Sequence, residues 1–264
     1  MVKKGTLALS SPVLTLTIDP QAIDLLALER RYRNSTRTAN SIRIPLSSLS
    51  LSTAETVSTT IQIPIRTITQ TKTLSIDGTI SATGEGTQTT VGASFKTPAL
   101  TIGTSLTLEG QVRYYTSEGD QVGRGPLPPT VGKETSYWVI ASIKNGGNTL
   151  RSPTFTATLL PHTSMGPLVS ATEGETPIYS PTTRTVTWKG RSLPPNAVVD
   201  IAFEVMLTPT PGMIGTSPPL IEILRATGID EATGKSLEST VRTNLGISLP
   251  LDERGRVKGI LITP

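Results

Sequence analysis

The run KETSYWVIASIKNGGN at residues 133–148 alternates apolar and polar side chains and ends in Asn-Gly. Successive side chains of a β-strand point to opposite faces, so the alternation predicts a strand with one buried and one wet side. Asn and Gly both tolerate positive φ, which predicts a tight turn at 145–146. The runs PTFTATLLP (153–161) and TRTVTWKGRSLPPNAVVDIAFEVML (183–207) repeat the pattern. Together they predict an antiparallel β-sandwich.

The composition of the whole chain agrees with this fold class. Its 264 residues can form one or two domains with a sizeable core, although only 36% of them are hydrophobic. Strands that bury one face need few apolar residues, and Thr suits the exposed face. The 23 Gly and 21 Pro provide many turns. We expect an all-β protein built from tandem immunoglobulin-like antiparallel β-sandwiches.

The segment TPALTIGT at 97–104 predicts a domain boundary. We expect a smaller β-sandwich domain at 1–100, an immunoglobulin-like β-sandwich domain at 101–249 and a flexible tail at 250–264. The second domain carries seven predicted strands, the number in a constant-type immunoglobulin domain. The predicted strands are 7–18, 26–34, 41–46, 57–68, 74–83 and 90–96 in the first domain, then 106–115, 134–144, 154–160, 183–189, 198–207, 221–228 and 237–247 in the second.

Residues 21–33, QAIDLLALERRYR, fit two structures. Local propensity favours a helix over 24–31. The alternation of Leu26, Leu28, Arg30 and Tyr32 favours a strand, as does the all-β setting. We predict a strand here.

The core of the second domain is predicted from the apolar positions of its alternating strands. Burial of a large aromatic side chain such as Phe203 is expected to stabilise the domain by about 1.5–3 kcal/mol. The predicted core residues are Tyr137, Val139, Ile143, Phe155, Val186, Trp188, Ile201, Phe203 and Val205.

Charge and composition exclude several classes of function. The net charge is +4, and only 4% of residues are aromatic, which does not favour a nucleic-acid surface even near the arginines at 30–37. The chain has no Cys, which excludes disulfides, thiolate metal sites and cysteine nucleophiles. Its one His, His162, lies in a turn-like run and is predicted to be solvated. No enzymatic activity, cofactor or metal is expected.

Three constellations resemble known sites. GIDEATGKS at 228–236 resembles a phosphate-binding loop, but its glycines are one residue too far apart and a strand follows, so a hairpin is predicted. A calcium site could draw on Asp200, Glu204, Asp230 and Glu231, but no short loop carries enough oxygen ligands. An isopeptide bond would need Lys133 or Lys144 beside Asn244 and the acid Glu204, and nothing in the sequence brings them together.

The two tryptophans, Trp138 and Trp188, allow a sugar-stacking interpretation. In immunoglobulin-like sandwiches a strand Trp more often packs in or at the rim of the core. We therefore predict packing positions for both and keep carbohydrate contact as the alternative.

Residues 137–148, a strand that runs into Lys-Asn-Gly-Gly, resemble the conserved repeat domains of bacterial and archaeal surface proteins. The stretches TFTATLLP (154–161), TVTW (185–188) and LPPNAVVDIAFEVML (193–207) fit the same pattern in the same order. These domains are immunoglobulin-like modules without an assigned function. Residues 103–249 also resemble the surface proteins of candidate-phylum bacteria, in which tandem sandwiches follow a membrane anchor.

The resemblance implies a structural or interaction module of a bacterial cell-surface protein, acting as a spacer or an adhesive surface. The alternative is a ligand-binding module for a glycan or a partner protein, through loops or edge strands. No window approaches the roughly 18 apolar residues of a membrane span, and the N-terminus lacks the apolar core of a signal peptide. We expect an extracellular or cell-surface location, with a cytoplasmic one as the alternative.

Overall fold

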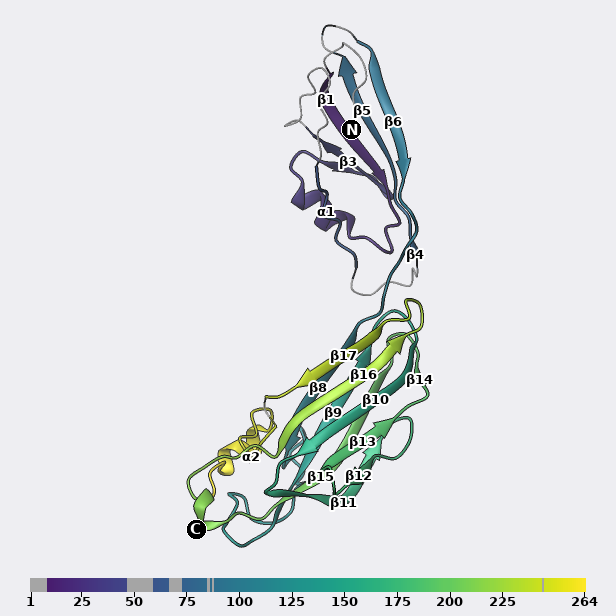
Figure 1. Cartoon of the computed structure of the whole chain (residues 1–264). Helices are drawn as coiled ribbons and strands as arrows, with labels where there is room; N and C mark the ends of the chain where they lie inside the picture. Colours follow the sequence, from purple (N-terminus) through teal and green to yellow (C-terminus); the bar gives the residue numbers. More distant parts are fainter. Residues whose placement is uncertain (1–8, 47–58, 67–72, 85, 87, 244) are drawn as a thin grey trace. The chain divides into compact units, whose positions relative to one another are not determined.

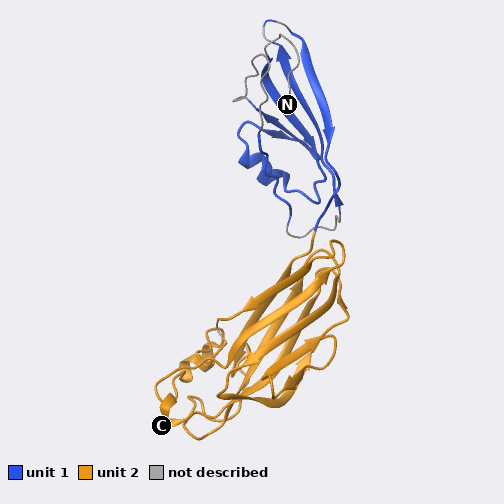
Figure 2. Ribbon diagram, viewed as in Figure 1, with its two compact units in different colours: residues 1–102 blue, residues 103–264 orange. Residues whose placement is uncertain are grey.

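The computed structural model describes residues 9–46, 59–66, 73–84, 86, 88–243 and 245–264. The chain divides into two compact units, unit 1 at residues 1–102 and unit 2 at residues 103–264 (Figure 2). Nearly all regular structure in both is antiparallel strand, which confirms the all-β fold class.

Unit 1 is built on a five-stranded sheet in the order β2-β3-β1-β5-β6 (Figure 1). A helix, α1 (Leu25–Arg31), contributes Leu25 and Leu28 to a core that also contains Leu14, Leu16 and Ile42 of the sheet. Two short strands, β4 and β7, pair with each other in a separate sheet. The strands are β1 (Leu9–Thr17), β2 (Thr36–Arg37), β3 (Ser41–Pro45), β4 (Thr73–Leu74), β5 (Asp77–Gly84), β6 (Thr90–Lys96) and β7 (Leu100–Thr101).

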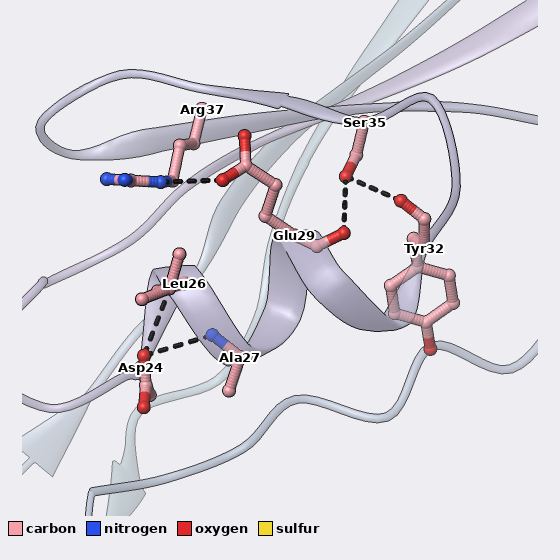
Figure 3. A network of polar contacts seen from close by, with 7 residues as sticks. All are labelled: Asp24, Leu26, Ala27, Glu29, Tyr32, Ser35 and Arg37. Carbon is pink, nitrogen blue, oxygen red and sulfur yellow. Dashed lines mark hydrogen bonds and ion pairs between the residues drawn. The ribbon is translucent and has the colours of Figure 1, made fainter.

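The strand predicted at 26–34 is wrong, because α1 occupies most of it. Asp24 caps this helix: its Oδ1 accepts the N–H groups of Leu26 and Ala27, each at 3.1 Å (Figure 3). These bonds, first of all the one from Ala27, lower the pKa of the Asp24 carboxyl. Ser35 closes the other end by donating to the carbonyls of Glu29 and Tyr32. A capped helix with two buried leucines outweighs the alternation seen in the sequence.

The strand predicted at 57–68 is wrong where the structure describes it, at residues 59–66. Ile61 and Ile63 pack against the core of unit 1, yet the backbone bonds to the region around α1 rather than to a sheet. Pro64 has no N–H, and its carbonyl accepts from Asp24 N at 3.1 Å. Apart from one isolated bridge between Ile23 and Ile65, these residues form no strand ladder. The ends of the predicted strand, 57–58 and 67–68, lie outside the described residues.

Unit 2 is a sandwich of two antiparallel sheets (Figure 1). One sheet has the order β11-β15-β9-β8 and the other β12-β13-β10-β16-β17, with β14 paired to β10. The strands are β8 (Leu106–Arg113), β9 (Thr135–Asn145), β10 (Leu150–Leu159), β11 (Thr163–Ala171), β12 (Ile178–Ser180), β13 (Thr185–Lys189), β14 (Ser192–Leu193), β15 (Val198–Leu207), β16 (Ile221–Asp230) and β17 (Ser236–Val241).

The core of unit 2 lies between these sheets and confirms the predicted set of residues. All nine predicted core side chains are at most 1% exposed. Phe203 of β15 and Phe155 of β10 meet across the sandwich, with ring centroids 6.4 Å apart. The alternation in β9 and β15 therefore marks the face that the sandwich buries.

The expectation of a flexible tail at 250–264 is wrong. The helix α2 (Glu253–Lys258) follows Asp252, which caps it, and Ile262 is buried in the core of unit 2. Thr263 forms a parallel bridge to Thr130, with its N–H donating to the carbonyl of Pro129 at 2.8 Å. The segment is mostly polar, which suggested a flexible tail, but Asp252 and Ile262 are buried and hold it against unit 2.

Candidate functional site

The stretch that resembles a phosphate-binding loop forms the hairpin between β16 and β17. Gly228 lies within β16, paired with Leu237 of β17, so its backbone belongs to the sheet ladder. At the turn, Gly234 has a φ of +68° and donates to the carbonyl of Asp230 at 2.8 Å. The element that directly follows this turn is the strand β17, whereas phosphate in such loops is held at the N-terminus of a helix.

The four candidate calcium ligands do not form a site. Asp200 accepts a hydrogen bond from Ser142 on the outer face of one sheet, whereas Asp230 belongs to the other sheet. Glu204 is paired with Arg124. Across the described part of the chain, no group of three or more His, Asp or Glu side chains could hold a metal ion. His162 is half-buried, and its Nε2 donates to the carbonyl of Pro219 at 2.7 Å, which ties two loops together.

The two lysines considered for an isopeptide bond lie at the surface. Lys144 forms an exposed ion pair with Glu109 at 2.6 Å, and Lys133 is exposed. Asn244 lies outside the described residues. Glu204 is fully buried, and its Oε1 accepts from Nη2 of Arg124 at 2.6 Å. Gly166 closes over this carboxylate: a Cβ there would lie 2.5 Å from Oε2, so only glycine fits. This ion pair fastens the loop after β8 onto the outer face of the sheet.

Two other buried carboxylates were not recognised from the sequence as anchors. The first, Asp230, lies where the chain enters unit 2. Its Oδ2 accepts from Thr104 N at 3.0 Å and from Thr233 Oγ1 at 2.7 Å. Its Oδ1 accepts from Ala232 N at 3.0 Å and from Asn148 Nδ2 at 3.2 Å. The entering chain is thus bonded to the turns between β9 and β10 and between β16 and β17.

Asn145 extends the same network. Its Nδ2 donates to the carbonyls of Asn148, Leu193 and Pro194, at 2.7, 3.0 and 2.8 Å. Its Oδ1 accepts from Thr104 Oγ1 at 3.1 Å. The Asn-Gly pair predicted a turn, and the structure adds that the Asn side chain joins several loops at this end of the sandwich.

The pH dependence of stability should report the Asp230 network. Burial raises the pKa of Asp230, but hydrogen bonds from Thr233, Thr104, Ala232 and Asn148 lower it, and the result lies below the ordinary value. A lowered folded-state pKa contributes stability above the unfolded pKa of about 3.9, which is lost as the pH falls through the folded value. We expect Asp230→Asn to destabilise unit 2 at neutral pH, with the difference from wild type shrinking below about pH 4.

Urea unfolding followed by tryptophan emission measures this effect, since both tryptophans lie in unit 2. Asp120→Asn is the matched control, because Asp120 is exposed and no hydrogen bond to its carboxylate is seen in the described part of the chain. A stability difference for Asp230→Asn that stays constant from neutral to acid pH would contradict the assigned role.

The second anchor, Asp252, lies where the C-terminal segment leaves the sandwich. Its Oδ2 accepts from the backbone N–H groups of Tyr114 and Tyr115, each at 2.7 Å. Its Oδ1 accepts from Gly255 N at 2.7 Å and so caps α2. The side chain is 2% exposed. One carboxylate therefore joins the end of β8 to the C-terminal helix.

The two tryptophans occupy different environments. Trp188 is fully buried, and its Nε1 donates to the carbonyl of Glu173 at 2.9 Å, which fits the core position predicted for it. Trp138 lies half-buried on the outer face of β9, and its Nε1 donates to the carbonyl of Val122 at 3.2 Å. Trp138 is thus held at the surface with part of its indole ring accessible.

Trp138 lines an open groove of about 460 Å³, which we call the tryptophan groove. A second hollow, of about 620 Å³, adjoins it at α2. Arg113, Thr116 and Ser117 line both. The remaining residues of the tryptophan groove are Gln111, Glu118, Val122 and Ile140.

Unit 1 offers a different surface at β6, the edge strand of its sheet. Every residue of β6 is exposed, including Val91 and Phe95. These two residues lie four positions apart on the strand and therefore point to the same face. Phe95 packs over Gly78 of β5, where a Cβ would lie 2.3 Å from the ring. In the described part of the chain no strand pairs with the outer edge of β6, which fits strand addition by a partner.

Comparison of the sequence finds no matching protein family and no similar curated protein. Among solved structures, the chain is similar to the full-length major pilin SpaD of Corynebacterium diphtheriae, with 9% identity and a TM-score of 0.35 over 88% of this chain and 58% of that one. It is also similar to BcpA, the major pilin subunit of Bacillus cereus, with 10% identity and a TM-score of 0.34 over 88% of this chain and 64% of that one.

A third similar structure contains three N-terminal domains of the type V pili tip protein Mfa5 of Porphyromonas gingivalis. Here the identity is 10% and the TM-score 0.28, over 37% of this chain and 21% of that one. The chain thus spans less than two thirds of each of these three structures. At such scores the likeness carries no assignment of function.

Proposed function

We propose that the chain is a structural segment of a cell-surface protein, in which unit 2 serves as an in-line, load-bearing spacer. The observation that carries this proposal is the placement of the two ends of unit 2. The chain enters the unit at one end, and the C-terminus lies at the opposite end (Figure 2). A force applied through the two ends would therefore act along the long direction of the sandwich.

Each end of unit 2 is fixed by a buried carboxylate. Asp230 binds the backbone of Thr104 just before β8, and Asp252 binds the backbone of Tyr114 and Tyr115 just after it. Between them, β8 pairs antiparallel with β9 from Leu106 to Arg113. The hydrogen bonds between antiparallel strands lie perpendicular to the strands. A force along β8 therefore acts on all of its hydrogen bonds to β9 at the same time. This arrangement suits a spacer, and the function needs no catalytic group.

The location proposed for the chain is outside the cell. Within the described residues, no helix is long and apolar enough to cross a lipid bilayer. Protease treatment of intact cells tests the location: a surface segment disappears from a blot of unit 2, whereas a cytoplasmic marker remains. Survival of the segment until the cells are lysed would contradict the proposal.

Mechanical unfolding tests the spacer function itself. The natural chain has no Cys, so pairs of introduced cysteines give defined attachment points. Pulling unit 2 through residues 103 and 264 should require a higher unfolding force than pulling through residues 147 and 234. The second pair lies in two turns at the entry end and would peel the strands apart one bond at a time. Equal forces, or a lower force for the first pair, would refute a load-bearing role.

A further inference from the structure

The tryptophan groove and the hollow beside it combine an aromatic platform with cationic side chains. Trp138, Ile140 and Val122 supply apolar surface in the groove, and Gln111, Thr116 and Ser117 supply polar groups around it. A pyranose ring has an apolar C–H face and a rim of hydroxyl groups. The groove therefore presents the two kinds of surface that a sugar ring needs, in an open site rather than an enclosed pocket.

The tryptophan is pre-positioned for such a contact. The bond from its Nε1 to the Val122 carbonyl, at 3.2 Å, satisfies the only polar group of the indole and fixes the ring on the sheet. Little conformational freedom is then lost when a ligand stacks on the ring. Trp188, the only other tryptophan of the chain, is fully buried and cannot take this role.

Three cations line the same region. Arg113 borders both hollows, and its Nε donates to Gln111 Oε1 at 2.9 Å, which orients the guanidinium group. Arg254 and Lys258 of α2 lie over the ring of Tyr115, at 4.8 and 5.4 Å from its centroid. Among the described residues, no carboxylate lies within 4.0 Å of the charged nitrogens of these three side chains.

The two hollows carry three carboxylates beside their three cations, and one of these carboxylates is buried. Asp252 is buried and its two oxygens accept three backbone N–H groups, so it is engaged within the fold. Glu118 accepts from Ser117 at 2.9 Å and, with Glu253, is the remaining acid of the two hollows. At the solvent-facing surface, Arg113, Arg254 and Lys258 therefore accompany two exposed carboxylates, which leaves a cation at the surface that can pair with an anionic group of a ligand.

We propose that unit 2 binds an acidic glycan, with a pyranose ring stacked on Trp138 and a sugar carboxylate paired with Arg113 and the cations of α2. Arg suits this role because its planar guanidinium can form paired hydrogen bonds with a carboxylate. This site is independent of the load-bearing role, since the spacer function requires only the anchors at the two ends. It would give the spacer an adhesive surface.

Isothermal titration of the full chain tests the proposal with three probes. The first is a hyaluronan hexasaccharide, in which glucuronic acid alternates with N-acetylglucosamine. The second is chitohexaose, its neutral counterpart, and the third is hexaglutamate, an acidic peptide. We expect binding of the first probe, weakened by added salt, and at least about tenfold weaker binding of the other two, a difference of about 1.4 kcal/mol.

Variants locate the binding. Trp138→Ala and Arg113→Gln should each weaken binding of the hyaluronan probe at least about tenfold, and Lys258→Gln should weaken it less. Trp138→Phe keeps an aromatic ring if the alanine variant does not fold, and it should retain part of the affinity. Lys235→Gln is the control, since it removes one exposed charge from the hairpin at the other end of unit 2.

Three results would overturn the proposal. One is the absence of binding of the hyaluronan hexasaccharide. Another is equal binding of chitohexaose, which would show that the charge is not recognised, or equal binding of hexaglutamate, which would show that the sugar is not recognised. The third is unchanged affinity in both Trp138→Phe and Arg113→Gln, measured on protein whose thermal unfolding matches the wild type. None of these results would alter the unfolding forces that test the spacer function.

Discussion

Replacement of Phe203 by Ala should lower the free energy of unfolding of unit 2 by about 3–5 kcal/mol. Phe203 is fully buried on β15, and its ring meets that of Phe155 on the opposite sheet. Its neighbours in the ladder, including Val139 on β9, belong to the same closed core and cannot collapse far into the space left by the ring. The loss therefore combines the transfer of the ring with the cost of a cavity.

Urea unfolding with tryptophan emission measures this loss in unit 2 alone, because Trp138 and Trp188 are the only tryptophans of the chain. Ile178→Ala is the control, since Ile178 on β12 is 68% exposed and its truncation should change stability by less than about 0.5 kcal/mol. A loss below about 1 kcal/mol for Phe203→Ala would show that this ring does not occupy the centre of the core.

The sandwich of unit 2 was predictable where one face of a strand is buried and the other is wet. The predicted bounds of β15 match the structure, as do those of β6 in unit 1, and β9 differs by one residue at each end. A period of two leaves its mark on the sequence whenever a sheet has a solvent-facing side. The same pattern identified buried residues on β9, β13 and β15, including Trp188 and Phe203.

Other elements left a weaker signal. β11 was not predicted, because Gly166 and Pro167 interrupt its sequence and its register against β15 shifts between Met165 and Val169. The glycine that breaks the pattern is required by the buried carboxylate of Glu204. In α1, helix propensity and a capping Asp competed with an accidental alternation, and the cap prevailed. Contacts between residues distant in sequence, such as that of Gly166 with Glu204, leave no trace in the local hydrophobic pattern.

The candidate surface was predictable only in part. The sequence identified Trp138 as a residue that could stack on a sugar, but it gave no reason to connect that residue with α2. The connection depends on the fold, which brings the segment after β8 against residues 251–258. A signal for the anchor did exist at Asp252, because an Asp that precedes a short basic helical run is a typical N-cap.

Asp252→Ala should release the C-terminal segment and lower the stability of unit 2 by about 3 kcal/mol or more. The substitution removes three hydrogen bonds of 2.7 Å to a charged acceptor and leaves the N–H groups of Tyr114, Tyr115 and Gly255 without it. α2 is only six residues long, so it has little stability of its own without its cap. Ile262 would then lose the support that holds it in the core.

Trypsin cleavage at Arg254, Arg256 and Lys258 measures this release directly, because a protease requires the segment to leave its docked position. Asp252→Asn is the matched variant. Its remaining carbonyl oxygen can still accept from Tyr114 and Tyr115, while its amide group faces the N–H of Gly255 and cannot accept from it. Cleavage should therefore be fastest in the alanine variant, intermediate in the asparagine variant and slowest in the wild type. If all three proteins were cleaved at the same rate, the C-terminal segment would be held by Ile262 and Thr263 without the carboxylate, and the exit of unit 2 would lack the anchor on which its load-bearing role depends.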